Sequence, residues 1–299
     1  MAAVKVWGGA LEFVPDELRE KDIYLIAATQ NGRALEIVSE EFRSKEVCLA
    51  AIKNYGRALK FVPKKLINKE VCLTAVKQDW NSFEFVPEEL KNKEICLNVV
   101  KQNGFALRLI PENLKNDKEI CLAAVKDWGC ALQFVPKDLC GYKDICLNVI
   151  RKNGDFLRFV SEESREKEMC LVAVKQCGAS LRHVPEKLRN KEICLIAVKQ
   201  HGNALKNVPK DLSGDKEVCL AAVEQDGDAL RFASRELRGD KEVCLAAVKR
   251  DGDALRFASR ELRDDKEVCF AAVKQNGEAL KHASDAMLCD KELWSAAKQ

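Results

Sequence analysis

The hydrophobic and polar residues of this chain follow one pattern that recurs every 24 or 25 residues. The segment 241–265, KEVCLAAVKRDGDALRFASRELRDD, is one copy, and its two neighbours are nearly the same string. With its first lysine counted as position 0, the equivalent lysine stands at residues 21, 45, 69, 93, 118, 143, 167, 191, 216, 241, 266 and 291. A period of this length is typical of repeat arrays, in which each copy buries its apolar face against its neighbours.

The first half of each copy has the apolar spacing of an α-helix. Val243, Cys244, Ala247 and Val248 recur at i, i+1, i+4 and i+5, which predicts a helical stripe, and a helical wheel places positions 2, 3, 4, 6 and 7 on one apolar arc. Ser, Asn or Asp precedes most of the lysines and is a good N-cap. Glycine at position 11, such as Gly252, predicts a left-handed residue that ends the helix. We therefore expect a helix of about ten residues in each copy.

The second half of each copy predicts a shorter helix and a final helical turn. Ala254, Leu255 and Ala258 share a face, and position 18 is then proline or serine, both of which start helical turns. Such short helices are not stable alone. We expect an all-α solenoid of about twelve repeats, forming a single domain over 1–299. It has a partial first repeat at 1–20, full repeats over 21–290 and a partial last repeat at 291–299.

Fourteen cysteines are present, and ten of them occupy position 3. Equivalent atoms of stacked helices lie about 8–10 Å apart, whereas a disulfide needs Cα atoms within about 7 Å. We expect buried free thiols that pack as small apolar side chains, and therefore a reducing, cytoplasmic compartment. The ten are Cys48, Cys72, Cys96, Cys121, Cys146, Cys170, Cys194, Cys219, Cys244 and Cys269.

The formal net charge of +3 gives no overall basicity of the kind that marks nucleic-acid binding. No apolar run approaches the roughly 18 residues of a membrane span, and the first residues lack the layout of a signal peptide. We expect no membrane association.

The string K-E-V-C-L-A-A-V-K-x-x-G-x-A-L-x-F, followed by A-S or V-P and x-E-L, resembles the repeats of the family named domain of unknown function 4116. The resemblance covers almost the whole chain, and it implies a helical repeat without an assigned activity. Two copies depart from the pattern. One has Trp80 in place of the glycine, with Ser82 and Phe83 in place of Ala and Leu, and another has Ser164 in place of the final-turn leucine.

Position 15 is a candidate partner-binding column, because its residues are mixed in sign early in the chain and basic later. The later cations lie about 10 Å apart if the repeats stack. Ordinary surface pairs with acids at position 12, an acidic protein partner and a nucleic-acid backbone all fit this column. Its basic members are Arg158, Arg182, Lys206, Arg231, Arg256 and Lys281.

Position 10 varies from copy to copy and is a candidate interaction rim, represented by Trp7, Tyr55, Trp128 and His201. The lysine at position 0 opposes the helix dipole. The helical wheel places its stem on the apolar arc, and we expect its ammonium to reach carbonyls or acids of a neighbouring copy.

No catalytic, cofactor or metal site is expected. The histidines His183, His201 and His282 have no cysteine at metal-ligand or nucleophile spacing, and no phosphate-binding motif occurs. The sequence therefore favours a non-catalytic scaffold for protein–protein interaction, with binding of an RNA backbone as the alternative. Apolar residues near the termini, Val4, Trp7 and Trp294, also raise head-to-tail self-association.

Overall fold

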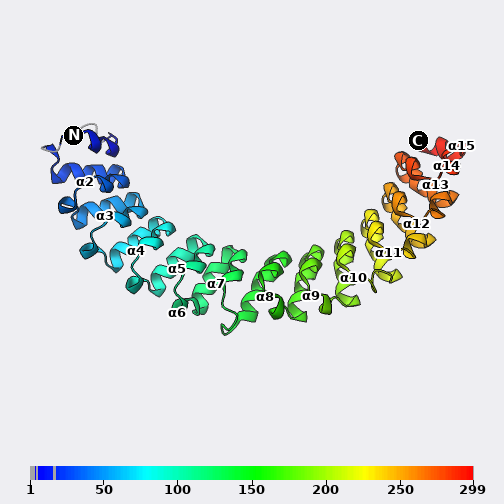
Figure 1. The fold of residues 1–299 in the computed structure, drawn as a ribbon, viewed down its shortest axis with the longest axis horizontal. Coiled ribbons are helices and arrows are strands. Elements are labelled where there is room, and N and C mark those ends of the chain that lie inside the picture. Colours follow the sequence, from blue (N-terminus) through cyan, green and yellow to red (C-terminus); the bar gives the residue numbers. More distant parts are fainter. Residues whose placement is uncertain (1–3, 5, 16–17, 299) are drawn as a thin grey trace. The chain divides into compact units, whose positions relative to one another are not determined.

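The computed structural model describes residues 4, 6–15 and 18–298. All regular elements of these residues are helices (Figure 1). A complete repeat has an α-helix at positions 0–9, a 3-10 helix that starts at position 11, and in most copies a last helical turn. The all-α solenoid of the sequence analysis is confirmed, and its second helix is of the 3-10 type.

The chain divides into two compact units, Met1–Tyr142 and Lys143–Gln299. The single domain expected for 1–299 stays a prediction. The elements of unit 1 are η1 (Gly8–Phe13), α2 (Lys21–Gln30), η3 (Gly32–Glu36), η4 (Glu40–Phe42), α3 (Lys45–Asn54), η5 (Gly56–Phe61), η6 (Lys64–Leu66), α4 (Lys69–Gln78), η7 (Trp80–Phe85), η8 (Glu88–Leu90), α5 (Lys93–Gln102), η9 (Gly104–Leu109), α6 (Glu112–Lys115), α7 (Lys118–Asp127) and η10 (Gly129–Phe134).

Unit 2 continues the same succession, and its first helix begins at Tyr142, the last residue of unit 1. Its elements are α8 (Tyr142–Lys152), η11 (Gly154–Phe159), η12 (Glu162–Ser164), α9 (Lys167–Gln176), η13 (Gly178–His183), η14 (Glu186–Leu188), α10 (Lys191–Gln200), η15 (Gly202–Asn207), α11 (Lys216–Gln225), η16 (Gly227–Phe232), η17 (Leu237–Gly239), α12 (Lys241–Arg250), η18 (Gly252–Phe257), η19 (Leu262–Asp264), α13 (Lys266–Gln275), η20 (Gly277–His282), α14 (Asp285–Leu288) and α15 (Lys291–Ala297).

The core consists of the apolar residues of the α-helices and of the 3-10 helices that pack on them. In α12, Val243 and Ala247 are fully buried, and Leu255 of η18 is buried with them. The predicted apolar arc is too wide by one position. Leu245 at position 4 is only half-buried, because it lies at the edge of the helix face that the neighbouring repeats cover.

The cysteines at position 3 are buried, and all fourteen cysteines of the chain are free thiols, as expected. Each of these thiols also has a polar partner in several repeats. The Cys244 thiol donates a hydrogen bond to the carbonyl of Arg238 at 3.2 Å, and burial raises the pKa of Cys244 to about 12. A cysteine therefore fills the core as an apolar residue would and also satisfies a carbonyl in the preceding loop.

The expected role of the glycine at position 11 is wrong. Among the described residues the only positive φ belongs to Gly141, at 86°. A Cβ added to Gly252 would instead lie 2.5 Å from the carbonyl oxygen of Ala272 in the next α-helix. Glycine is therefore needed because two consecutive repeats approach each other too closely for a side chain.

The α-helices end where the backbone becomes extended at position 10. Asp251 has φ −145° and ψ 110°, and its carboxylate accepts a hydrogen bond from the backbone N–H of Asp253 at 3.0 Å. One residue therefore stops the α-helix and caps the 3-10 helix that follows.

The close contact at position 11 predicts a large cost for the smallest possible side chain. We expect Gly252→Ala to lower the free energy of unfolding by about 1–3 kcal/mol, because the added carbon would push apart two packed helices. Urea denaturation followed by circular dichroism measures the effect.

Gly239→Ala is the matched control, because an added Cβ there would meet only Ser259, at 3.8 Å. We expect a change within about 0.5 kcal/mol. Equal losses in the two variants would contradict the close-approach explanation.

Candidate partner-binding surface

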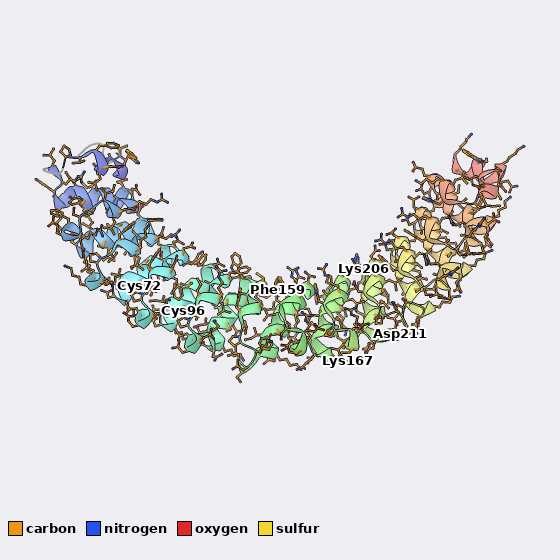
Figure 2. The ribbon with its side chains drawn as sticks, in the orientation of Figure 1. Cys72, Cys96, Phe159, Lys167, Lys206 and Asp211 are labelled. Carbon is orange, nitrogen blue, oxygen red and sulfur yellow. The ribbon has the colours of Figure 1, made fainter. Side chains whose placement is uncertain are left out.

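The 3-10 helices of unit 2 pack in succession from η11 through η13, η15, η16 and η18 to η20. Figure 2 shows Phe159 and Lys206 on one edge of this unit and Lys167 and Asp211 on the opposite edge. We call the surface formed by positions 12, 15 and 16 of unit 2 the 3-10 face. It contains the six basic residues predicted as a partner-binding column.

The cations at position 15 are exposed, and most of them are held by acids at position 12. Arg158 pairs with Asp155 in its own repeat, and Arg182 of the next repeat pairs with the same carboxylate at 2.7 Å. Asp228 in the same way pairs with Arg231 at 3.2 Å and with Arg256 at 2.9 Å. Each of these aspartates joins two successive repeats.

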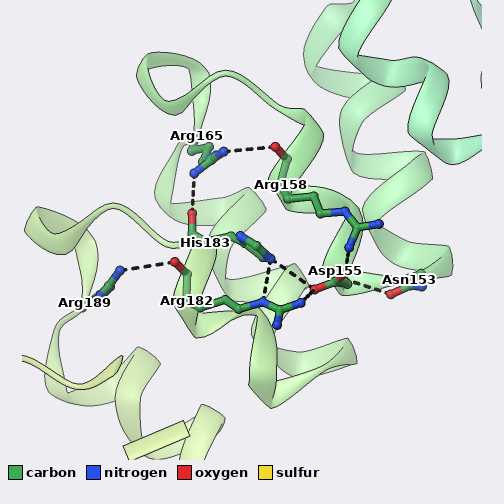
Figure 3. A network of polar contacts seen from close by, with 7 residues as sticks. All are labelled: Asn153, Asp155, Arg158, Arg165, Arg182, His183 and Arg189. Atoms are coloured by element: carbon green, nitrogen blue, oxygen red, sulfur yellow. Dashed lines mark hydrogen bonds and ion pairs between the residues drawn. The ribbon is translucent and has the colours of Figure 1, made fainter. Parts of the chain in front are cut away.

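The network around Asp155 also includes a histidine (Figure 3). The Arg158 guanidinium lies 2.6 Å from Asp155 Oδ2, and Arg182 donates from its Nε to His183 Nε2 at 2.9 Å. Burial acts to raise the pKa of Asp155, but the hydrogen bond and charge of Arg182 outweigh it and hold this pKa below its usual value. Burial lowers the pKa of His183, so Asp155 is charged and His183 neutral at neutral pH.

Several of these arginines also lie over the aromatic ring at position 16. The guanidinium carbon is 4.6 Å from the ring centroid for Arg158 on Phe159 and 4.4 Å for Arg231 on Phe232. Cation–π contacts of this kind fix a long side chain in one orientation. The arginines of the 3-10 face are therefore preorganised by the protein itself.

Lys206 and Lys281 are held less firmly than the arginines. Lys281 pairs with Glu278 at 3.5 Å. Position 12 of the Lys206 repeat is Asn203, whose amide donates to Asp226, and no ion pair is found for Lys206 among the described residues. Lys206 is thus the cation of the column that is most available to a partner.

Position 10 combines a structural role with exposed side chains. Its Asn and Asp members cap the following 3-10 helix, as Asn153 does by accepting from the backbone N–H of Asp155 at 2.9 Å. Of the four residues proposed as a rim, Tyr55 is half-buried and His201 is exposed. Trp7 and Trp128 are 59% and 39% exposed. Their role in recognition stays a prediction.

The lysines at position 0 form a ladder of ion pairs along the N-terminal ends of the α-helices. The Lys241 ammonium lies 2.8 Å from Asp265, the N-cap of the next helix, and 2.8 Å from Glu267 in its first turn. The expectation that these ammonium groups reach acids of a neighbouring copy is confirmed. The expected position of the stem is wrong, because the Lys241 side chain is 45% exposed.

The length of a repeat sets the number of acids at each rung. The repeat at 69–92 has 24 residues, and Lys69 pairs with Glu94 alone, at 2.8 Å. The repeat at 216–240 has 25 residues, and Lys216 pairs with both Asp240 and Glu242. Hydrogen bonds to these acids raise the pKa of Lys216, and the bond from Lys216 lowers the pKa of Asp240.

Sequence analysis missed a second link between repeats, made by the arginine at position 22. Arg165 donates to the carbonyl of Val160 in its own repeat at 2.9 Å and to the carbonyl of His183 in the next repeat at 2.7 Å (Figure 3). We call this residue the clasp arginine. Recurrence was its only signal, in Arg19, Arg43, Arg165, Arg189, Arg238 and Arg263.

Neither chemistry nor membrane insertion finds a candidate in the described part of the chain. No group of three or more His, Cys, Asp or Glu residues there is arranged to hold a metal ion. No helix there combines the length and apolar character needed to cross a membrane. Near the termini, Val4 is buried, whereas Trp7 and Trp294 are exposed, and head-to-tail association stays a prediction.

The ladder predicts that charge order matters more than the presence of any one lysine. We expect Lys167→Glu to lower the urea midpoint, because it faces Glu192, and we expect the double variant Lys167→Glu/Glu192→Lys to recover most of the loss. Urea titrations at low salt and at 1 M salt measure this. The differences should shrink at high salt, where the screening length falls to about 3 Å. A double variant that is less stable than the single variant would rule out this pairing.

The repeats match a known family model. The model, described as Domain of unknown function (DUF4116), matches segments 1–43, 44–91, 92–140, 124–165, 142–189, 166–213, 190–238, 215–263, 240–288 and 265–297. Neither the curated proteins nor the solved structures contain a match to this chain.

Proposed function

Because the chain belongs to the Domain of unknown function (DUF4116) family through repeats that cover nearly all of its length, we propose that it is a non-catalytic scaffold that binds an acidic protein segment on the 3-10 face of unit 2. The observation that carries the proposal is the sharing of acids on this face. Arg158 and Arg182 share the single carboxylate of Asp155. Two positive charges against one negative charge leave a net +1 at this cluster.

The two repeats that follow Asp155 add to this imbalance. Position 12 is Ala179 in one and Asn203 in the other, while position 15 supplies Arg182 and Lys206. Arg158, Arg182 and Lys206 with Asp155 therefore carry a net +2 on positions 12 and 15. A row of exposed cations favours a partner with carboxylates at a similar spacing.

Preorganisation supports binding to this row. The arginines are already held by carboxylates and aromatic rings, so a partner need not immobilise them, and the entropic cost of association is reduced. A guanidinium has five N–H donors. Arg158 uses one printed hydrogen bond to Asp155, which leaves donors for a second carboxylate.

Charge reversal tests the location of the site. We expect Arg182→Glu/Lys206→Glu to abolish binding of a fluorescent oligoglutamate peptide in an anisotropy titration. The matched control is Lys187→Glu/Lys210→Glu, which makes the same change of net charge at exposed lysines outside the column. The control should bind like the wild type, and equal losses in both variants would refute a site on the 3-10 face.

Random RNA separates the competing class in the same assay. Phosphate contacts give an affinity that falls steeply with salt, by roughly 0.7 in log K per log salt unit for each contact to a single strand. RNA binding with such a slope, lost in Arg182→Glu/Lys206→Glu while the peptide fails to bind, would replace the acidic protein partner with nucleic acid.

Removing the shared acid should have the opposite effect. We expect Asp155→Asn to tighten oligoglutamate binding several-fold, because it frees two guanidiniums and adds one positive charge to the cluster. The control is Asp211→Asn on the opposite edge (Figure 2), which changes net charge equally and should leave the affinity near that of the wild type. Weaker binding by Asp155→Asn would show that Asp155 is needed to position the arginines.

A further inference from the structure

The repeat at 69–92 in unit 1 departs from the pattern at both ends of its second half. Trp80 stands at position 11, where the close contact between repeats requires glycine in most other copies, and Phe83 replaces the buried leucine. At position 22 the clasp arginine is replaced by Lys91. Changes at these places affect the same joint, the one between η7 and η9.

A clasp arginine normally closes this joint. In an earlier repeat, Arg43 donates to the carbonyl of Val38 at 2.7 Å and to the carbonyl of Phe61 in the next repeat at 2.8 Å. Lys91 donates instead to the carboxylate of Glu88, within its own repeat, and lies 4.8 Å from the centroid of the Phe83 ring. The joint between η7 and η9 is therefore left without its usual link.

A cavity of about 380 Å³ occupies this joint. Such a volume lies near the lower end of the ~300–1,000 Å³ range of small-ligand pockets. Trp80, Phe83 and Leu109 provide its apolar wall, and Glu84, Lys91 and Arg108 provide its charges. It is a pocket that the regular repeats do not require for stacking.

The charges of the lining favour an anion. The Lys91 side chain is only 10% exposed, and its hydrogen bond to Glu88 leaves two of its three donors unused. Arg108 is exposed, with no ion pair found among the described residues. Two cations and one carboxylate line the cavity, which gives a net +1. The apolar wall meanwhile suits a planar ring.

We propose that this cavity binds an aromatic ring that bears a carboxylate, with the ring against Trp80 and Leu109 and the carboxylate toward Lys91 and Arg108. A free aromatic acid and the C-terminal aromatic residue of a polypeptide have this same chemistry. The site is independent of the 3-10 face of unit 2.

Three fluorinated probes of one size test the chemistry by ¹⁹F NMR: 4-fluorophenylacetate, 4-fluorophenylacetamide and 4-fluorophenethylammonium. We expect broadening of the ¹⁹F signal to be strongest for the acetate, weaker for the amide and absent for the ammonium probe. Equal broadening by all three, or preference for the ammonium probe, would overturn the proposal.

Restoring the clasp tests the location with a variant that should fold. We expect Lys91→Arg to reach the Leu109 carbonyl, fill the cavity, abolish probe binding and keep or raise the thermal midpoint. The matched control is Lys115→Arg at the same position of the next repeat, where the lysine also pairs within its repeat, with Glu112. This control should bind the probe like the wild type. Retained binding in Lys91→Arg, or lost binding in Lys115→Arg, would place the probe elsewhere.

Two peptides then distinguish the sources of the ligand. A peptide that ends in phenylalanine with a free carboxylate displaces the bound acetate probe if the site reads a polypeptide terminus, whereas its C-terminal amide does not. If neither peptide displaces the probe, the ligand is a free aromatic acid.

Discussion

The contact between the glycine at position 11 and the next α-helix is the constraint on which the array depends. At Gly154 an added Cβ would come within 2.1 Å of the Ala173 carbonyl oxygen, so the two backbones are nearly as close as atoms permit. The residue that receives this contact is alanine in most copies, and that alanine is fully buried. Small residues on both sides therefore fix the distance between successive layers in each unit.

A fixed distance between layers brings the same side chains into register at every joint. Lys191 meets Asp215, Arg182 meets Asp155, and Arg165 meets the His183 carbonyl because each pair spans a single joint. Exposed ion pairs of this kind contribute little stability individually. They repeat along the unit because the backbone spacing repeats, and they orient the charges that a partner would meet.

The sequence predicted what lies within one repeat and missed what lies between repeats. Helical periodicity identified Val243 and Cys244 as core residues, since burial follows directly from the spacing of apolar positions. It assigned Gly252 a left-handed conformation, because the common role of glycine at a helix end is local, whereas its role here is to admit the neighbouring repeat.

The candidate sites show the same division. The basic column was visible from the sequence, but the sharing of Asp155 by two arginines needed the structure, because Asp155 and Arg182 are 27 residues apart. The departure at Trp80 was also visible. The cavity was not, because it depends jointly on Trp80, on Lys91 and on two residues of the following repeat.

The alternation between 24 and 25 residues has a mechanical consequence. An inserted residue comes with an aspartate such as Asp265, which accepts from the backbone N–H groups of Glu267 and Val268 and also from the Lys241 ammonium. The start of one helix is then stabilised by a side chain of the helix before it, so folding of the earlier repeat favours folding of the later one. Insertion or deletion of a single loop residue thus adjusts how cooperatively neighbouring repeats fold, without any change to the core.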